Sequence, residues 1–215
     1  MNESPFQSAI KERFYAEEER SANVRFFSVL LCIFLIVCCL WGMFVRAFGV
    51  IIVDGNSMNQ TFVNGEKLLM RFTTDNFKAE RGDVIVVNVK KYGFTDKKGN
   101  TIEFLIKRLI AIEGDKVKCT DGQIQICYAG ETDYVPLDEP YAYYGVNDSY
   151  KTSYDFAEYT VGEGEVFFLG DNRSYVGSSV DSRYQEGMSH RNELYKEEDV
   201  FGVVPAWAMN HSCAN

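Results

Sequence analysis

Residues 26–45 read FFSVLLCIFLIVCCLWGMFV, a run of 20 residues without a charged side chain. An α-helix rises about 1.5 Å per residue, so this run would be about 30 Å long, which matches the hydrocarbon core of a bilayer. Arg25 and Arg46 stand at its two ends, and Trp41 and Phe44 lie where interfacial aromatic residues are common. The run therefore predicts a single membrane-spanning helix over 26–45.

Two other interpretations of this run are weaker. A cleaved secretory signal has a shorter apolar region, and no small-residue cleavage pattern follows before Arg46. The helix of a soluble core would carry a polar stripe, and none is visible.

Basic residues near the ends of the run predict its orientation. Arg46 is the only Lys or Arg in the twenty residues after the run, whereas four precede it: Lys11, Arg13, Arg20 and Arg25. Flanks rich in Lys and Arg stay in the cytoplasm. The expected organisation is a cytoplasmic tail over 1–25, the helix over 26–45 and an extracytoplasmic domain over 46–215.

The composition excludes several classes of protein. With 17 Gly, 4 Pro and 6 Cys in 215 residues, the chain is not collagen-like, disordered or a disulfide-dense miniature. Its 22 Lys and Arg against 31 Asp and Glu give a net charge of −9, which argues against nucleic acid as a partner.

The part after the helix has the pattern of β-strands. Short apolar runs alternate with turn sequences such as Asn64-Gly65 and Asp121-Gly122. We expect a mainly β domain with an inserted subdomain over about 119–164, a segment rich in Tyr, acid and Gly, and a charged excursion over 184–199. The expected strands lie in the runs 47–53, 67–72, 83–89, 102–112, 123–127 and 165–170.

Cysteine is only mildly informative. Cys119, Cys127 and Cys213 would face an oxidising compartment, where one pair could form a disulfide, and the sequence leaves this open. No C-x-x-C or H-E-x-x-H spacing occurs, so we expect no metal site.

Lys107 is the best candidate for a general base. It lies in IEFLIKRLIAI (102–112), where both faces of the expected strand are mostly apolar. An ammonium group loses hydration there, which lowers its pKa and favours the neutral amine. Enzymes bring lysine to about 7–8 in this way. The alternative is that the side chain reaches solvent and does no chemistry.

Ser57 is the candidate nucleophile. It follows the turn Asp54-Gly55-Asn56 at the end of an expected strand, where its hydroxyl would be exposed and its N–H free to face an oxyanion. The alternative is an ordinary turn serine. The two histidines, His190 and His211, lie in charged or terminal sequence and are interpreted as surface residues.

Five blocks occur in order: GNSMNQT (55–61), RGDVIV (81–86), KRLIAIEGD (107–115), GDNR (170–173) and SVDSR (179–183). Together, behind the predicted anchor, they make the chain resemble the type I signal peptidases, the membrane-anchored Ser/Lys proteases of bacteria. The resemblance covers most of 47–183. It departs from the family pattern at Gln60 and Glu66, and by a longer linker near 176–178.

The resemblance implies a role for each matching residue. Ser57 would be the nucleophile and Lys107 the general base, with Ser179 orienting the amine and Asp181 and Arg183 forming a nearby ion pair. Asp171 and Arg173 would support the same scaffold, and the Ser57 N–H would donate to the oxyanion. Gly55 stands where some relatives supply a second, hydroxyl donor, so this chain lacks that donor.

The resemblance also implies a substrate and a location. The enzyme would cleave N-terminal signal peptides from exported preproteins after small residues, at the outer face of the bacterial cytoplasmic membrane, without cofactor or metal. Its partners would be preprotein signal peptides and the lipid bilayer, with the secretion translocon as a further candidate. Matching positions suggest pocket walls at Ile51, Val53, Met58, Phe62, Leu105 and Ile106, for which core packing is the alternative.

Three rival interpretations have different residue requirements. A catalytically inactive relative that binds signal peptides or a partner would not need the Ser57 and Lys107 pair. A self-cleaving repressor-type Ser/Lys peptidase would need a soluble DNA-binding domain, which does not fit the predicted span. A Ser/His protease would depend on His190. The distance from the Ser57 hydroxyl to the Lys107 amine discriminates most sharply among them.

Overall fold

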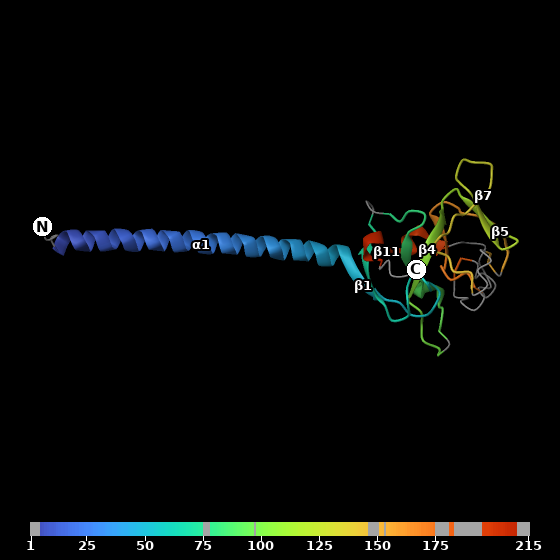
Figure 1. The fold of residues 1–215 in the computed structure, drawn as a ribbon, viewed down its shortest axis with the longest axis horizontal. Coiled ribbons are helices and arrows are strands. Elements are labelled where there is room, and N and C mark those ends of the chain that lie inside the picture. The colour runs from blue at the N-terminus through green and yellow to red at the C-terminus, as the bar shows by residue number, and fades with distance from the viewer. Residues whose placement is uncertain are drawn as a thin grey trace. The chain divides into compact units, whose positions relative to one another are not determined.

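A computed structural model describes residues 5–74, 78–96, 98–145, 151–152, 154–174, 181–182 and 195–209 (Figure 1). The chain divides into two compact units, Met1–Ala47 and Phe48–Asn215. The first is a helix and the second is built from β-strands, so the predicted fold class is confirmed. The finer boundaries at 25, 45, 119 and 164 stay predictions.

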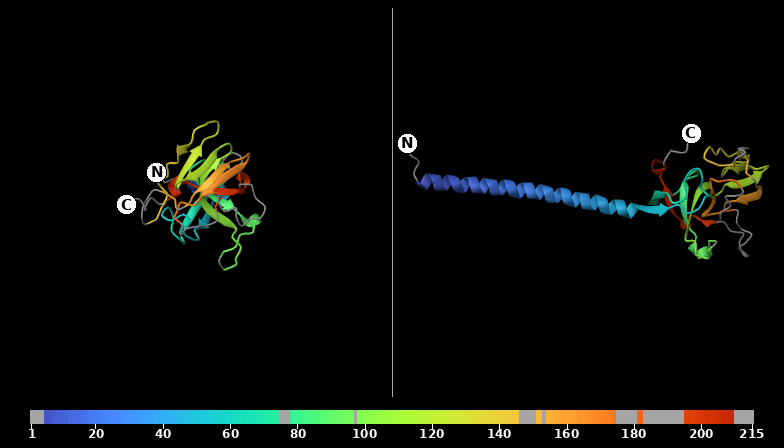
Figure 2. Two further views of the ribbon diagram at one scale, coloured as in Figure 1. Left: turned by 90° about the vertical axis from the view of Figure 1, so that its right-hand side faces the viewer. Right: turned by 60° about the horizontal axis from the view of Figure 1, so that its bottom comes forward.

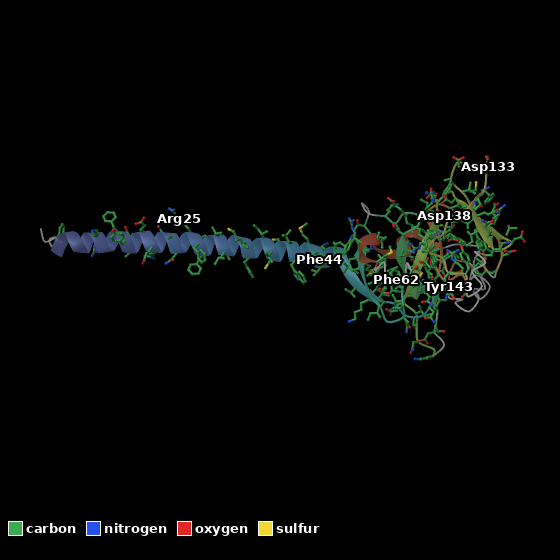
Figure 3. The ribbon with its side chains drawn as sticks, viewed as in Figure 1. Arg25, Phe44, Phe62, Asp133, Asp138 and Tyr143 are labelled. Carbon is green, nitrogen blue, oxygen red and sulfur yellow. The ribbon has the colours of Figure 1, made fainter. Side chains whose placement is uncertain are left out.

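The first unit is one continuous helix, α1 (Pro5–Ala47), of 43 residues (Figure 2). Its part from Arg13 to Ala47 is long and apolar enough to cross a membrane. Large apolar side chains on it are exposed within the unit, among them Leu31, Trp41 and Phe44, the last labelled in Figure 3. An apolar surface of this extent is typical of a helix surrounded by lipid.

The second unit contains a seven-stranded antiparallel sheet. Its order is β1 (Phe48–Ile52), β2 (Lys67–Phe72), β11 (Val200–Val204), β3 (Val84–Asn88), β4 (Phe104–Ile112), β9 (Glu165–Leu169) and β10 (Tyr195–Lys196). Five of these strands lie in the predicted apolar runs. The sequence pattern missed β10, which is two residues long, and β11, which lies in the middle of the sheet.

A second, four-stranded sheet has the order β7 (Val135–Pro136), β6 (Gln123–Cys127), β5 (Lys116–Thr120) and β8 (Phe156–Thr160). Strands β5 and β6 form a hairpin through Asp121 and Gly122, both with positive φ, as a two-residue turn of this kind requires. The register pairs Cys119 with Ile124 and Cys127 with Lys116, and both thiols are free. Cys213 lies outside the described residues.

Strand β4 is the common element of the core. Leu105 and Leu109 belong to one buried cluster, which we call the first cluster, and Ile110 and Ala111 to the second, beneath the four-stranded sheet. Ile106 packs against a third cluster of residues from β2, β3, β11 and the loop after β1. Because β4 packs against all three, six of its nine positions are buried and only Phe104 is exposed. Three short 3₁₀ helices complete the described unit: η1 (Lys90–Tyr92), η3 (Glu197–Asp199) and η4 (Ala206–Ala208).

Asp115, between β4 and β5, ties the two sheets together. Its carboxylate is fully buried and accepts hydrogen bonds from Arg81 Nε at 2.6 Å and Nη2 at 2.8 Å. It also accepts from the backbone N–H of Ile112 at 3.0 Å and of Ala129 at 2.9 Å. One side chain therefore joins the end of β4, the segment before β3 and the segment after β6.

We expect Asp115→Ala to lower the free energy of unfolding by about 2 kcal/mol, because two backbone N–H groups and the Arg81 guanidinium lose their buried acceptor. The measurement is a urea titration of the detergent-solubilised chain followed by near-UV circular dichroism. Asp133→Ala, at an exposed carboxylate in the loop before β7 (Figure 3), is the control and should change stability by less than about 0.5 kcal/mol. Equal losses in the two variants would contradict the assigned role of Asp115.

Candidate active site

Ser57 lies in the loop between β1 and β2, and this loop is closed at its base. Val53 N–H donates to the Glu66 carbonyl at 2.9 Å, and Gly65 N–H donates back to the Val53 carbonyl at 2.8 Å. Gly55 has a φ of +94°, a conformation that favours glycine, and its N–H donates to Asn64 Oδ1 at 2.9 Å. The two ends of the loop are thus hydrogen-bonded to each other, and none of these bonds involves Ser57 itself.

Apolar side chains from the same loop enter the core. Met58 and Phe62, the latter labelled in Figure 3, are each only 1% exposed and belong to the third cluster. Ser57 itself is half-buried. Met58 and Phe62 therefore anchor the loop in the core, while Ser57, directly before Met58, keeps some access to solvent.

The Lys107 amine donates a hydrogen bond to Ser57 Oγ at 2.7 Å. Lys107 lies within β4, opposite Ile85 of β3, and is 1% exposed. The side chain therefore does not reach solvent, which was the alternative interpretation of this lysine. The structure brings together the two residues that the sequence singled out, from positions fifty apart in the chain.

Ser57 lies so close to position 170 that only glycine, which has no Cβ atom, fits there. Gly170 follows β9, whose Leu169 pairs with Arg108, the residue next to Lys107. A Cβ atom at position 170 would lie 2.4 Å from the Ser57 carbonyl oxygen and 3.4 Å from the Ser57 Cβ. Real Cβ atoms essentially never come this close to a backbone atom, so a side chain at 170 would displace Ser57.

A buried ion pair braces one side of the site. Arg108 donates to Asp171 through Nη2 at 2.6 Å and Nε at 3.1 Å, and both side chains are almost fully buried. Thr61 Oγ1, from the Ser57 loop, donates to the same carboxylate at 2.5 Å. The Arg108 guanidinium also lies 4.1 Å from the ring centroid of Tyr141. These contacts join β4, the Ser57 loop and the segment after β9.

A second buried ion pair follows at once in the chain. Arg173 donates to both carboxylate oxygens of Glu139 and, through Nε, to the Gly170 carbonyl at 2.6 Å. Burial alone would lower the pKa of Arg173, but the Glu139 carboxylate and neighbouring tyrosines raise it above its ordinary value, so the guanidinium stays charged. Sequence reasoning found Asp171 and Arg173 but missed Glu139 and Tyr141, whose segment shows no periodic pattern.

The remaining supporting residues are only partly described. Ser179 and Arg183 lie outside the described residues, as do His190 and His211. Asp181 is 3% exposed. Its neighbour Ser182 donates its N–H to the Phe168 carbonyl at 3.1 Å and accepts the Phe168 N–H at 2.9 Å through Oγ. Asp181 thus belongs to a segment fixed along β9.

The six predicted pocket residues fall into two groups. Val53, Met58 and Phe62 are buried in the third cluster, and Ile51 and Ile106 are half-buried and pack against it. Leu105 belongs instead to the first cluster and is 9% exposed. The structure therefore brings five of the six together.

Metal-ligating side chains are not clustered in the part of the chain that is described. No group of three or more His, Cys, Asp or Glu side chains there could hold a metal ion. The chemistry available to the described site is that of a hydroxyl, an amine and backbone N–H groups.

We expect Gly170→Ala to reduce cleavage of a preprotein by about 100-fold, because a displacement of Ser57 by about 1 Å separates it from the Lys107 amine. The measurement is the rate of cleavage of a purified preprotein by the detergent-solubilised chain. Gly42→Ala, where an added Cβ meets nothing within 4 Å, is the control and should cleave normally. Full activity of the Gly170 variant would show that the Ser57 loop has room to move.

Comparison with known proteins places this chain in a family. The family described as "Signal peptidase, peptidase S26" matches residues 25–206. The chain is 31% identical to Signal peptidase I P of Bacillus subtilis subsp. natto over 158 residues, which cover 70% of this chain and 74% of that protein. It is 28% identical to Signal peptidase I U of Bacillus subtilis (strain 168) over 178 residues, with coverages of 80% and 84%.

A crystal structure of a signal peptidase I from Enterococcus faecalis V583 is 27% identical and covers 60% of this chain and 97% of that one, with a TM-score of 0.41. The family match extends over most of the chain and includes Ser57, Lys107 and the segment 170–173. The chain belongs to the S26 signal peptidase family of serine proteases.

Proposed function

We propose that this chain is a membrane-anchored serine endopeptidase that cleaves N-terminal signal peptides from exported preproteins with a Ser57/Lys107 dyad. The observation that carries the proposal is the 2.7 Å hydrogen bond between Lys107 Nζ and Ser57 Oγ, with the lysine 1% exposed. An amine in this position can take the hydroxyl proton directly, without a histidine.

The dyad requires a neutral amine, and burial supplies the reason for one. A charged ammonium in a site from which water is excluded loses its hydration, so the neutral form is favoured. In the first step Ser57 Oγ attacks the carbonyl carbon of the scissile bond while its proton passes to Lys107 Nζ. The Ser57 N–H donates to the oxygen that becomes negatively charged.

The second half of the cycle uses the same lysine as an acid and then as a base. The tetrahedral intermediate collapses, the C–N bond breaks, and Lys107 gives its proton to the leaving amine. This leaves the signal peptide esterified to Ser57 Oγ. A water molecule then loses a proton to Lys107 and attacks the ester, and the returning proton restores the Ser57 hydroxyl.

Three further residues complete the proposed machinery. Ser179 would orient the Lys107 amine, and Asp181 and Arg183 would form an ion pair that holds the Ser179 segment. Burial of Asp181 beside β9 supports a structural role for this segment.

Selection of small residues would come from the apolar side chains around Ser57. Ile51 and Ile106 are the two of the six candidates that are only half-buried, so we propose that they contact the substrate side chains. The other four, Val53, Met58, Phe62 and Leu105, are almost fully buried and would limit the depth beneath them. A shallow apolar surface of this kind excludes bulky side chains.

We further propose that α1 anchors the enzyme in the bacterial cytoplasmic membrane with its amino end in the cytoplasm, and that the β unit acts on the outer side. The basic residues before the apolar run and the apolar length of α1 support this orientation. The preprotein signal peptide would then meet the enzyme in the same membrane, which raises its effective concentration. The secretion translocon remains a proposed partner.

We expect Ser57→Ala and Lys107→Met each to reduce preprotein cleavage by at least about 1,000-fold, because each removes one half of the dyad. The measurement is the appearance of mature protein from a purified preprotein, and circular dichroism confirms folding. Lys78→Met, at an exposed lysine, is the matched control. Equal cleavage by all the chains would reject the dyad, whereas a wild-type chain that binds the preprotein but does not cleave it would favour the inactive relative.

We expect kcat/KM to fall tenfold per pH unit on the acid side, because only the neutral Lys107 amine can accept a proton. The apparent pKa of this limb should lie well below about 10.4, the ordinary value for lysine, since burial favours the neutral form. The measurement is a pH profile between pH 5 and pH 10. A rate that stays constant down to pH 5 would contradict the role of the amine.

A further inference from the structure

Asn172 contacts the backbone of the nucleophile at two points. Its own N–H donates to the Ser57 carbonyl at 2.9 Å, and its side-chain Nδ2 donates to the Asn56 carbonyl at 3.1 Å. Asn172 comes directly after Asp171, in the segment that follows β9, so these bonds cross between parts of the chain more than 110 residues apart.

The orientation of the Asn172 amide is fixed by Ser174. The amide oxygen accepts hydrogen bonds from Ser174 N–H at 3.1 Å and from Ser174 Oγ at 2.6 Å. The amide nitrogen can only donate and the amide oxygen can only accept. With the oxygen held by two donors, the nitrogen must face the Asn56 carbonyl.

The Asn56 carbonyl and the Ser57 N–H belong to the same peptide unit. This unit is planar and trans, so its C=O and N–H point in opposite directions. A hydrogen bond that holds the Asn56 oxygen therefore also fixes the direction of the Ser57 N–H, which is the proposed oxyanion donor. A donor contributes to catalysis only if it is aimed at the place where the charge develops.

Asn172 also links the Asn56–Ser57 peptide unit to the sheet that contains Lys107. The backbone around it is held by the Tyr143 segment, since Tyr143 N–H donates to the Asp171 carbonyl at 2.8 Å and Arg173 N–H donates to the Tyr143 carbonyl at 2.7 Å. The segment that contains Asn172 follows β9, and β9 pairs with β4, the strand that contains Lys107. The Asn59 N–H, 3.1 Å from the Asn56 carbonyl, comes from within the loop and does not provide this link.

We infer that Asn172 is a positioning residue that aims the Ser57 N–H at the oxyanion. This inference rests on the proposed function, because it assigns a role to the amide beside the proposed nucleophile. Asn172 does not touch the substrate or move a proton, so its loss should weaken stabilisation of the transition state and leave binding of the ground state intact.

The test compares two variants of Asn172 with a matched control in the same loop. Asn172→Ala removes the clamp, and Asn172→Asp keeps its shape and its acceptor for Ser174 but replaces the donor to Asn56 with an oxygen. Asn64→Ala is the control, because it removes another side-chain hydrogen bond to this loop, at Gly55, without touching the Asn56–Ser57 peptide unit.

We expect both Asn172 variants to lower kcat by about 10- to 100-fold with KM nearly unchanged, and Asn64→Ala to lower kcat by less than about 3-fold. A peptide aldehyde that matches the residues before the cleavage point adds the Ser57 hydroxyl and places its oxygen at the oxyanion position. Its affinity should fall by the same factor as kcat. The matching peptide alcohol, which cannot add Ser57, should bind the variants as it binds the wild type. The acid limb of the pH profile should not move, because the Lys107 amine is unaffected.

Several outcomes would overturn the inference. The inference is wrong if Asn172→Asp has the kcat of the wild type, or if the Asn172 variants lose equal affinity for the aldehyde and the alcohol. It is also wrong if Asn64→Ala loses as much kcat as the Asn172 variants. A parallel Ser57→Ala reaction separates this failure from failure of the proposed function. If Ser57→Ala is inactive while both Asn172 variants are normal, the dyad stands and only the role of Asn172 is wrong.

Discussion

The site depends on one physical condition, which is that the buried Lys107 amine lies beside the Ser57 hydroxyl. Lys107 is buried because β4 packs against all three apolar clusters and so has almost no exposed position. An isolated charge in such a place is costly, and lysine can avoid this cost by giving up its proton. The burial that stabilises the fold would therefore also prepare the proposed base.

Lys107 and Arg108 are neighbours on β4 and both are buried, but burial has different consequences for a lysine and an arginine. Arg108 is also buried, but a guanidinium does not lose its proton in proteins, so its charge requires a partner. Asp171 supplies that partner and at the same time accepts the Thr61 hydroxyl from the Ser57 loop. The ion pair beside Lys107 thus holds a permanent charge in place and attaches the Ser57 loop to β4.

Local pattern predicted much of this arrangement. The charge-free run indicated the helix, short apolar runs indicated six strands, and the turn at Gly55 indicated an exposed serine. Strand β5 was missed because KVKCT has only two apolar residues and so forms no apolar run, and β8 because FAEYT lies in a Tyr-rich segment without clear periodicity. The partners Glu139 and Tyr141 could not be predicted, because their contacts cross 34 and 33 positions of the chain without a local signal.

The position of Ser57 depends on how the buried side chains around it pack. Gly170 is required because Ser57 approaches the backbone so closely that no Cβ fits between them. The carbonyl of Gly170 in turn accepts from Arg173, whose charge is balanced by Glu139. A chain of buried contacts therefore runs from the Tyr-rich segment to the nucleophile. Since interiors are close-packed and yield little, we expect a change at Glu139 to alter the distance between the Ser57 hydroxyl and the Lys107 amine.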